Sequence, residues 1–282
     1  MNKPLIGFIG QGFIGKNYAD DFEARGYSVV RYALEEPYRQ NKEKVAECDI
    51  VFIAVPTPST PDGFDFSIAK AALSLIGKEK IAVIKSTILP GTTELLQKEN
   101  PNIFVFHSPE FLREVTAAQD AARPDRNIIG IPVDNDLYRA KADEVLSVLP
   151  AAPFTKICLA KEAEIVKYAG NNFLYTKVVY MNLIYDIVQK MGCDWEVVRD
   201  AMIADPRIGA SHMNPVHAGG RGAGGHCFIK DFAAMESFYK ENIGDSLGLQ
   251  VLQSLEKKNI SLLSTDGKDR ELLEGVYGRE NI

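Results

Sequence analysis

The sequence predicts an α/β protein in which an N-terminal parallel sheet with helices is followed by an all-helical domain that contains one long central helix. Two observations predict this arrangement. Short apolar runs alternate with helix-like or polar segments through the first half of the chain, whereas apolar residues recur every three to four positions over a long stretch of the second half. We therefore expect two domains, residues 1–155 and residues 156–282.

The composition is that of a globular protein that can build two cores. Of the 282 residues, 46% are hydrophobic and 25% are charged, which is unlike a disordered chain. The net charge of −6 argues against nucleic acid as a partner, although a local basic pocket could still hold a phosphorylated ligand. No apolar stretch reaches the roughly 18 residues needed to span a bilayer, and no signal peptide precedes the first strand. We expect a cytoplasmic protein without a membrane partner.

Neither disulfides nor a metal site is expected. The four cysteines are widely scattered in a chain without an export signal, so we expect reduced thiols. The four histidines show no spacing that is typical of metal ligands. The residues concerned are Cys48, Cys158, Cys193, Cys227, His107, His212, His217 and His226.

Six apolar runs predict the strands of the sheet. Runs that are apolar on both faces suit a parallel sheet covered by helices, in which ligands bind beyond the carboxyl ends of the strands. The runs are Leu5–Ile9, Ser28–Tyr32, Ile50–Ala54, Ile81–Ile84, Ile103–Phe106 and Asn127–Ile131.

The first run ends in a glycine pattern that predicts a dinucleotide site. In residues 10–15, Gly10 permits a tight turn, Gly12 lets the backbone approach a pyrophosphate, and Gly15 lets the following helix pack closely on the strand. The helix that begins near Phe13 offers its N-terminus to the phosphate charge. The pattern therefore favours a Rossmann-type domain that binds NAD or NADP.

The position that usually contacts the cofactor's ribose carries no acid. About 20 residues after the glycines, at the end of the second strand, the chain has Ala33. Glu35 or Glu36 could reach the ribose hydroxyls, or could simply lie in a solvated loop, and Arg31 could instead accept the 2′-phosphate of NADP. We favour NAD.

Prolines, hydroxyls and carboxylates follow the next three strands. The segments are 55–58, 85–92 and 108–114. The prolines are explained by the need to end strands and stiffen turns. The repeated hydroxyls and carboxylates at the ligand-facing end favour a binding cleft.

A helical pattern over residues 161–191 predicts the long central helix. Its apolar residues step by three and four and form one stripe that we expect to be buried, either in the chain or against a second copy in a homodimer. Lys167 and Asn171 lie one turn apart, where they could share a ligand atom or form part of a solvated face. The stripe consists of Ile165, Ala169, Phe173, Thr176, Tyr180, Leu183, Ile187 and Met191.

Four glycines surround Cys227 in the segment GRGAGGHCFIKDF, residues 220–232. Free cysteine is most often a buried apolar residue. Here the glycines would let a substrate approach the backbone, a helix is expected to begin just after the cysteine, and Lys230 is nearby, all of which favour a reactive thiolate. Further helices are expected at 194–204, 232–241 and 246–263, followed by a charged tail.

Together, these motifs resemble the UDP-glucose/GDP-mannose dehydrogenase family, which oxidises the C6 alcohol of a sugar nucleotide to a carboxylate for uses such as polysaccharide biosynthesis. The resemblance extends from residue 5 to about residue 260. The motifs, in family order, are Gly10-x-Gly12-x-x-Gly15, 55–58, 86–92, 109–114, Lys167-x-x-x-Asn171, Asp205-x-Arg207-Ile208-Gly209 and 224–231. Family members usually continue into a third domain that helps to bind the nucleotide, and this sequence ends before it.

The resemblance implies an oxidation of the UDP-glucose to UDP-glucuronate type that takes two hydride transfers to NAD. Cys227 would hold the intermediate aldehyde as a thiohemiacetal and then as a thioester. Lys167 and Asn171 would stabilise the oxyanion at C6, and Asp231 would support the water network. Either Glu110 or Glu114 would activate the hydrolytic water, with Glu110 preferred, and Thr87 would position water and the nicotinamide.

The resemblance also assigns binding residues. Those for NAD are Gly10, Gly12, Phe13, Ile14, Gly15, Pro56, Thr57, Ser86, Thr87, Glu114 and Lys230. Those for the sugar nucleotide are Glu110, Phe111, Leu112, Arg113, Lys167, Asn171, Arg207 and Gly224, where Arg207 could act in its own site or in that of a partner subunit.

Two other classes of protein fit part of the sequence. The β-hydroxyacid dehydrogenases join similar domains and carry Lys-x-x-x-Asn, but they transfer one hydride and need no thiol. A non-catalytic subunit that only binds a dinucleotide is a third alternative. Such a subunit would not need a thiol, a lysine, an asparagine and a glutamate in one site. The stoichiometry of cofactor reduction separates the three alternatives.

Overall fold

The computed structural model describes residues 3–282, except for the side chain of Asn281. The chain divides into two compact units. The first contains residues 1–57 and 65–167, and the second contains residues 58–64 and 168–282. The predicted division after residue 155 stays a prediction.

The first unit is built on a seven-stranded sheet with the order β2-β1-β3-β6-β7-β8-β9. All six predicted runs form strands, and every neighbouring pair is parallel except β7 and β8. The seventh strand, β9, was not predicted, because Thr155 and Lys156 interrupt its apolar residues and none of the six is fully buried. The strands are β1 (Ile6–Ile9), β2 (Val29–Tyr32), β3 (Ile50–Ile53), β6 (Ile81–Ile84), β7 (Phe104–His107), β8 (Arg126–Ile131) and β9 (Phe154–Leu159).

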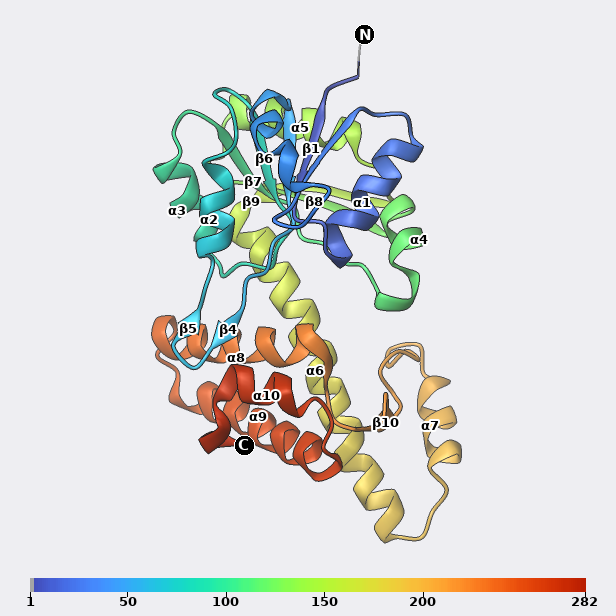
Figure 1. The fold of residues 1–282 in the computed structure, drawn as a ribbon. Coiled ribbons are helices and arrows are strands. Elements are labelled where there is room, and N and C mark those ends of the chain that lie inside the picture. The colour runs from blue at the N-terminus through green and yellow to red at the C-terminus, as the bar shows by residue number, and fades with distance from the viewer. Residues whose placement is uncertain (1–2) are drawn as a thin grey trace. The chain divides into compact units, whose positions relative to one another are not determined.

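Helices cover both faces of this sheet. Figure 1 shows α1 and α4 on one side of the sheet and α2 and α3 on the other. Alternate strand residues pack with α1, α4 and α5 into one core, in which the rings of Phe8 and Phe52 stack with 5.1 Å between centroids. The helices are α1 (Phe13–Ala24), α2 (Ser67–Leu73), α3 (Thr92–Glu99), α4 (Ala117–Ala122) and α5 (Asp136–Val148), with short 3-10 turns η1 (Arg39–Asn41), η2 (Glu43–Glu47) and η3 (Glu114–Thr116).

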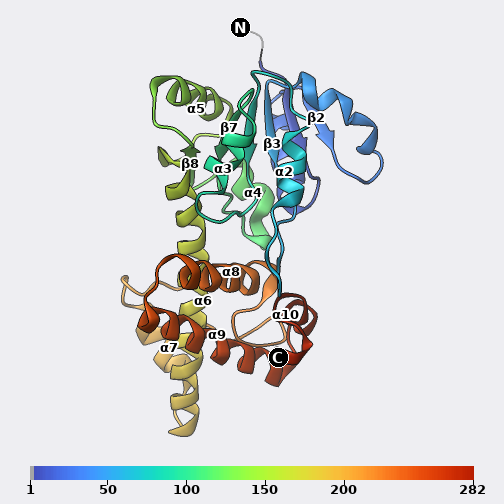
Figure 2. The same cartoon turned by 90° about the vertical axis from the view of Figure 1, so that its left-hand side faces the viewer.

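The second unit is helical, with two small hairpins. Figure 2 shows α8 and α9 side by side, with α10 against them. One hairpin, β4 (Ser59–Thr60) with β5 (Gly63–Phe64), comes from early in the chain and packs on α8. The other elements are α6 (Ala160–Lys190), α7 (Trp195–Ile203), β10 (Val216–His217), β11 (Gly220–Arg221), α8 (Gly225–Asn242), α9 (Ser246–Asp266), α10 (Arg270–Tyr277) and η4 (Arg279–Asn281).

The predicted stripe on the long helix lies on the wrong face for the core of this chain. α6 has nearly the predicted bounds, but the stripe is largely exposed, with Phe173 at 68% and Ile187 at 58% of their accessible surface. The buried positions belong to a neighbouring stripe that includes Tyr175 and Val179, which pack with Phe232 of α8. Because α6 is apolar on both faces, periodicity alone could not choose between them.

The predicted charged tail contains a helix that the sequence analysis did not predict, because residues 270–277 form α10. Its apolar side buries Leu273 against Ile229 of α8 and Leu263 of α9. The chain reaches this helix through Gly267, which has a left-handed φ of 69°. In the part of the chain that the structure describes, no helix is both long enough and apolar enough to span a membrane.

Candidate active site

The glycine turn after β1 has the geometry of a dinucleotide cradle. Gly10 has a left-handed φ of 92°, and a Cβ there would collide with the carbonyl oxygen of Ala54. A Cβ on Gly15 would collide with the carbonyl oxygen of Gly10, so helix and strand require this glycine in order to pack. An added Cβ on Gly12 would meet no atom within 4 Å. The space beside Gly12 is therefore open to a ligand.

The N-terminus of α1 is prepared for an anion. Gly12 occupies the N-cap position without a side chain to bond the first N–H groups, and the first turn of α1 contains no acidic residue. Phe13 is exposed in this turn, while Ile14 packs against the core of the sheet. Unbonded N–H groups at a helix start fit a pyrophosphate. The residues present therefore fit the dinucleotide that the sequence predicts.

The end of β2 favours NAD over NADP. Arg31 could have accepted a 2′-phosphate, but its Nη2 lies 2.7 Å from Asp20 Oδ1 and 2.7 Å from Glu23 Oε2. A guanidinium that already donates to two carboxylates is a poor binding partner for a further anion, such as a 2′-phosphate. Glu35 and Glu36 are exposed in the loop that follows β2, where nothing in the described structure fixes their carboxylates.

Hydroxyls tie together the carboxyl ends of β3 and β6. Ser86 Oγ donates to Val55 O at 2.7 Å and accepts from Val55 N at 3.0 Å. Thr57 Oγ1 donates to Thr87 O at 2.7 Å. Thr57, Ser86 and Thr87 are buried, and Pro56 is exposed beside them. Two of the predicted cofactor hydroxyls thus have a structural bond that the sequence did not suggest.

A buried ion pair joins Glu110, just beyond β7, to Lys167 of α6. Lys167 Nζ donates to Glu110 Oε1 and to Glu110 O, both at 2.8 Å. The other carboxylate oxygen of Glu110 accepts from Leu112 N at 2.8 Å. Glu114 is exposed at the start of η3. The structure therefore separates two carboxylates that the sequence could not distinguish.

Lys85 and His107 are buried close enough to this pair to interact with its charges. Lys85 Nζ donates to Ser108 Oγ at 3.1 Å and lies 4.5 Å from the centre of the Tyr18 ring. Burial lowers the pKa of Lys85 to about 8 and that of His107 to about 3. The sequence analysis missed Lys85, although a lysine that directly follows a fully buried strand is an unusual residue.

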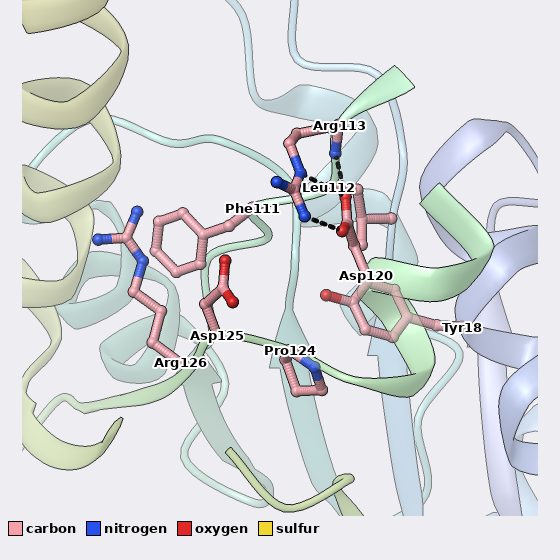
Figure 3. A pocket seen from close by; sticks show the side chains of 8 residues that line it. All are labelled: Tyr18, Phe111, Leu112, Arg113, Asp120, Pro124, Asp125 and Arg126. Carbon is pink, nitrogen blue, oxygen red and sulfur yellow. Dashed lines mark hydrogen bonds and ion pairs between the residues drawn. The ribbon is translucent and has the colours of Figure 1, made fainter. Parts of the chain in front are cut away.

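A cavity of about 320 Å³ opens beside the loop after β7. Figure 3 shows three predicted substrate residues on its wall, Phe111, Leu112 and Arg113. Arg113 is held by Asp120, with Nη2 2.5 Å from Oδ1. The guanidinium of Arg126, which the sequence analysis missed, stacks 3.6 Å from the centre of the Phe111 ring. This wall combines an aromatic face with charge, which suits a polar ligand.

Within the second unit, Cys227 lies exposed in the first turn of α8. The helix begins at Gly225, so the prediction that it begins after the cysteine is wrong by one turn. Asp231, one turn further along α8, is fully buried and accepts from Asn171 Nδ2 at 2.6 Å and from Lys230 Nζ at 2.6 Å. The carboxylate thus fixes two predicted site residues.

Most of the glycines before Cys227 are required by packing. A Cβ on Gly220 would lie 2.9 Å from Asp266 Cβ, and one on Gly222 would lie 3.0 Å from Asn259 Oδ1. A Cβ on Gly224 would collide with a carboxylate oxygen of Asp269. Only Gly225 has open space at that point. Packing alone can therefore account for the first three glycines, and their role in substrate access stays a prediction.

Arg207 has a predicted substrate role and is largely exposed. Its side chain retains 88% of its accessible surface and pairs with Asp205 at 2.6 Å. Lys177 of α6 donates to Ile208 O at 2.9 Å and to Gly209 O at 3.0 Å, which anchors the loop behind the arginine. In the described residues, no group of three or more His, Cys, Asp or Glu side chains is arranged to hold a metal ion.

The predicted site residues fall into two sets, one in each unit. The first unit holds the glycine turn, the hydroxyls, Glu110, Glu114, residues 111–113 and Lys167. The second holds Asn171, Arg207, Gly224, Cys227, Lys230 and Asp231.

Comparison with solved structures gives relatives of similar fold. A UDP-glucose dehydrogenase from the archaeon Pyrobaculum islandicum superposes with a TM-score of 0.77 at 27% identity, covering 91% of this chain and 68% of that one. A 3-hydroxyisobutyrate dehydrogenase from Mycobacterium tuberculosis superposes with a TM-score of 0.73 at 15% identity, covering 97% and 99%. The second likeness is one of fold alone.

Sequence relatives are more specific. A UDP-glucose 6-dehydrogenase of Rhizobium meliloti is 37% identical over 208 residues, 69% of this chain and 46% of the relative. The putative UDP-glucose 6-dehydrogenase YtcA of Bacillus subtilis is 32% identical over 235 residues, 78% of this chain and 53% of the relative. The chain thus spans about half the length of these curated relatives.

Two family models match the chain. Residues 37–145 match the NAD binding domain, and residues 161–260 match the central domain, of the same family. The glycine turn at residues 10–15 lies before the first match. The two matches together cover most of the chain, and the protein therefore belongs to the UDP-glucose/GDP-mannose dehydrogenase family.

Proposed function

We propose that the protein oxidises the C6 alcohol of a nucleotide sugar to the uronic acid, with UDP-glucose as the preferred candidate substrate. The observation that carries the proposal is the exposed thiol of Cys227 in the first turn of α8, one turn before the Asp231 carboxylate and its two partners. A thiol at a helix start is favoured as a thiolate, which is the reactive form.

The reaction needs a covalent tether because the intermediate aldehyde must not escape. The oxidant is NAD: two molecules, bound one after the other, would each accept one hydride from C6. Cys227 Sγ adds to the C6 aldehyde, forming a C–S bond while the carbonyl oxygen takes a proton. Oxidation of this thiohemiacetal leaves a thioester. Water then attacks C6, the C–S bond breaks, and the acid and the free thiol are released.

Lys167 and Asn171 are proposed to stabilise the oxyanion that forms at C6. Both are donors that are already held in place, Lys167 by Glu110 and Asn171 by Asp231. Donors that need no reorganisation are the most effective at stabilising developing charge. Asp231 keeps the amide of Asn171 and the ammonium of Lys230 oriented.

Glu110 is proposed as the base that activates the hydrolytic water, in preference to Glu114. Its carboxylate is buried and oriented by Leu112 N on one oxygen and Lys167 Nζ on the other. A general base must be held at a fixed place beside its water. Glu114 is exposed and is better suited to contact the cofactor, as the family resemblance implies.

Homodimerisation through α6 is part of the proposal. The exposed apolar stripe extends from Ile165 to Met191 along most of the helix. Exposed apolar patches of this kind are typical of interfaces between protein chains. In a symmetric dimer the same stripe on each copy would cover the other. Arg207 could then contribute to the partner's site.

The deciding experiment measures NAD reduction by the purified chain with UDP-glucose, UDP-N-acetyl sugars, GDP-mannose and simple hydroxyacids. We expect two NADH per molecule of sugar nucleotide, with the uronic acid as product. One NADH per hydroxyacid would instead support a single hydride transfer. The absence of turnover with every substrate would support a non-catalytic subunit.

The role of Cys227 is tested with Cys227→Ser, and Cys193→Ser serves as the matched control because Cys193 is also exposed. We expect the first variant to lose acid formation by about three orders of magnitude or more, as other enzymes do when a nucleophile is removed. The control should retain activity. Unchanged acid formation by Cys227→Ser would exclude the tether.

A further inference from the structure

The turn between α9 and α10, residues 266–269, packs against the loop that leads into α8. This turn lies beyond the part of the chain that matches the family, which ends at residue 260. Two of its residues are left-handed, Gly267 with a φ of 69° and Asp269 with a φ of 54°. A non-glycine residue in this region is strained, and such strain often marks a functional constraint.

Asp269 caps a helix other than its own. It occupies the N-cap position of α10, where an aspartate normally bonds the first N–H groups of its own helix, but its side chain makes no such bond. Asp269 Oδ2 instead accepts from Gly225 N, the first residue of α8, at 2.8 Å. The N-cap residue of α8, Gly224, has no side chain of its own to do this.

The turn at residues 266–269 and the start of α8 are in close contact at Gly224. Any side chain at Gly224 would collide with the Asp269 carboxylate, so the glycine leaves the room that the cross-helix cap needs. Cys227, three residues after Gly224, lies in the helical turn whose first N–H group donates to this carboxylate.

Lys268 holds the other part of the loop. Its Nζ donates to His217 O at 2.8 Å, to Gly222 O at 3.2 Å and to Gly220 O at 3.4 Å. Burial lowers the pKa of Lys268, and the charges of Asp269 and Asp266 oppose this effect. Asp266 Oδ2 accepts from Arg221 N at 2.7 Å. The turn therefore bonds the loop at successive points from residue 217 to residue 225.

We propose that Lys268 and Asp269 are positioning residues, which hold loop 217–225 and the first turn of α8 so that Cys227 is presented in one orientation. The catalytic part of this inference rests on the proposed function, whereas the part that concerns the loop does not. Neither residue needs to touch substrate or cofactor for this role.

The first test is amide hydrogen exchange, resolved by residue, in Asp269→Ala and Asp269→Asn. Loss of a cap typically opens a helix end by about five- to tenfold. We expect Asp269→Ala to speed exchange by this factor at Gly225 and over residues 228–230. Asp269→Asn keeps an acceptor oxygen and should stay within about twofold of the wild type.

Two further variants distinguish loss of the cap from a general loss of stability. Glu271→Ala removes an exposed carboxylate from the same helix, and we expect it to leave exchange in α8 unchanged. Lys268→Met keeps the apolar stem but removes the donors, and it should speed exchange over residues 217–222. If Asp269→Ala fails to fold, Lys268→Met remains as the test of the same turn.

The second test follows turnover in the same variants. We expect Asp269→Ala to lower kcat about tenfold and to leave KM for NAD within about twofold, while Asp269→Asn recovers most of kcat. Unchanged exchange in Asp269→Ala, or equal losses in the Ala and Asn variants, would overturn the inference. If Cys227 is not the nucleophile, exchange will still change and kcat will not, which distinguishes failure of the two proposals.

Discussion

At the scale of single residues, the chain places basic and acidic groups in a layer behind the strand ends of the first unit. Lys85 and Lys167 share the charge of Glu110, and Lys85 is the more costly of the two cations to bury. Its ammonium has one hydroxyl partner and the face of Tyr18. A cation held this weakly in the interior should make stability depend on pH.

Lys85 provides a test through the pH dependence of unfolding. Burial lowers its pKa from 10.5 to about 8 in the folded chain, with Glu110 opposing and Lys167 adding to that effect. The unfolded chain therefore binds the proton more tightly, and the cost of burial is present below pH 8 and disappears as the pH rises toward 10.5. Relative to Lys85→Met, the wild-type free energy of unfolding should rise by roughly 3 kcal/mol over this range.

Urea unfolding at a series of pH values measures this difference. Lys85→Met removes the titrating group but keeps a side chain of similar length, so both proteins share every other titration. Parallel stability curves for the two proteins would show that Lys85 remains charged and solvated in the folded chain.

The two carboxylates beyond β7 provide a second test. We expect Glu110→Gln to lower kcat by about 10²-fold or more, because a general base contributes about 10² to 10⁴. Glu114→Gln is the matched control, since its carboxylate is exposed, and it should change kcat only a few fold. Steady-state kinetics with both substrates decides, and a larger loss in Glu114→Gln would reverse the assignment.

At the scale of elements, α6 combines a buried face with an exposed apolar face, and both extend along most of the helix. The buried face packs on α8 through Tyr175, whose ring stacks on Phe232 at 3.9 Å. The exposed face carries apolar residues, whereas the solvent-facing side of a helix is typically polar. The helix is therefore suited to pack against two neighbours, one in its own chain and one supplied by a second copy.

The exposed face predicts that Phe173→Glu shifts the protein toward monomers. Burying a phenylalanine is worth about 1.5–3 kcal/mol, and a symmetric interface contains it twice. The dissociation constant of the dimer should rise at least about a hundredfold, as measured by sedimentation. Val197→Glu is the control because Val197 is comparably exposed, at 66%, but lies on α7. A wild type that is monomeric at all concentrations would contradict the proposal.

Local sequence patterns predicted most helices and strands correctly, but they did not predict which elements pack against each other. The glycine turn and α6 depend on residues that are close in the chain, so spacing was enough to identify them. The face of α6 that is buried depends on which surface α8 occupies. The need for glycine at 220, 222 and 224 depends on Asp266, Asn259 and Asp269, respectively. Such distant contacts leave no local periodicity. The cross-helix cap of α8 was invisible for the same reason.

The candidate site shows the same limit. Glu110 and Glu114 are equivalent by spacing, and only the ammonium of Lys167 separates them. Arg126 was missed because no motif surrounds it, and Lys85 was missed because its burial beside Ser108 and Tyr18 depends on contacts distant in the sequence. By contrast, the roles of Gly10 and Gly15 followed from their place after a strand, since the need for a tight turn and close packing is local.

At the scale of the whole molecule, the chain crosses between its two units more than once. Residues 58–64 leave the first unit, form a hairpin in the second, and return. Within the second unit, Ser59 Oγ donates to Lys230 O at 3.0 Å, and the hairpin also packs on α10. The second unit is therefore assembled from two separate stretches of sequence.

This assembly predicts that residues 156–282, produced alone, will not unfold cooperatively. The fragment lacks the hairpin that covers α8 beside Lys230. Thermal unfolding followed by circular dichroism should give a broad transition for the fragment and a sharp one for the full chain. A sharp transition in the fragment would show that the hairpin is dispensable.

The early hairpin also has a consequence for biosynthesis. During translation, residues 58–64 leave the ribosome while the helix on which they will rest is still unmade, because α8 begins only at Gly225. Until then the hairpin has no helix to pack on, so the second unit cannot complete its fold before α8 has been synthesised. A premature stop after β9, which ends at Leu159, but before Gly225 would thus yield a chain with all seven strands of the sheet and without the helix on which the hairpin packs. Chaperones could recognise the apolar surface that stays exposed in such a chain.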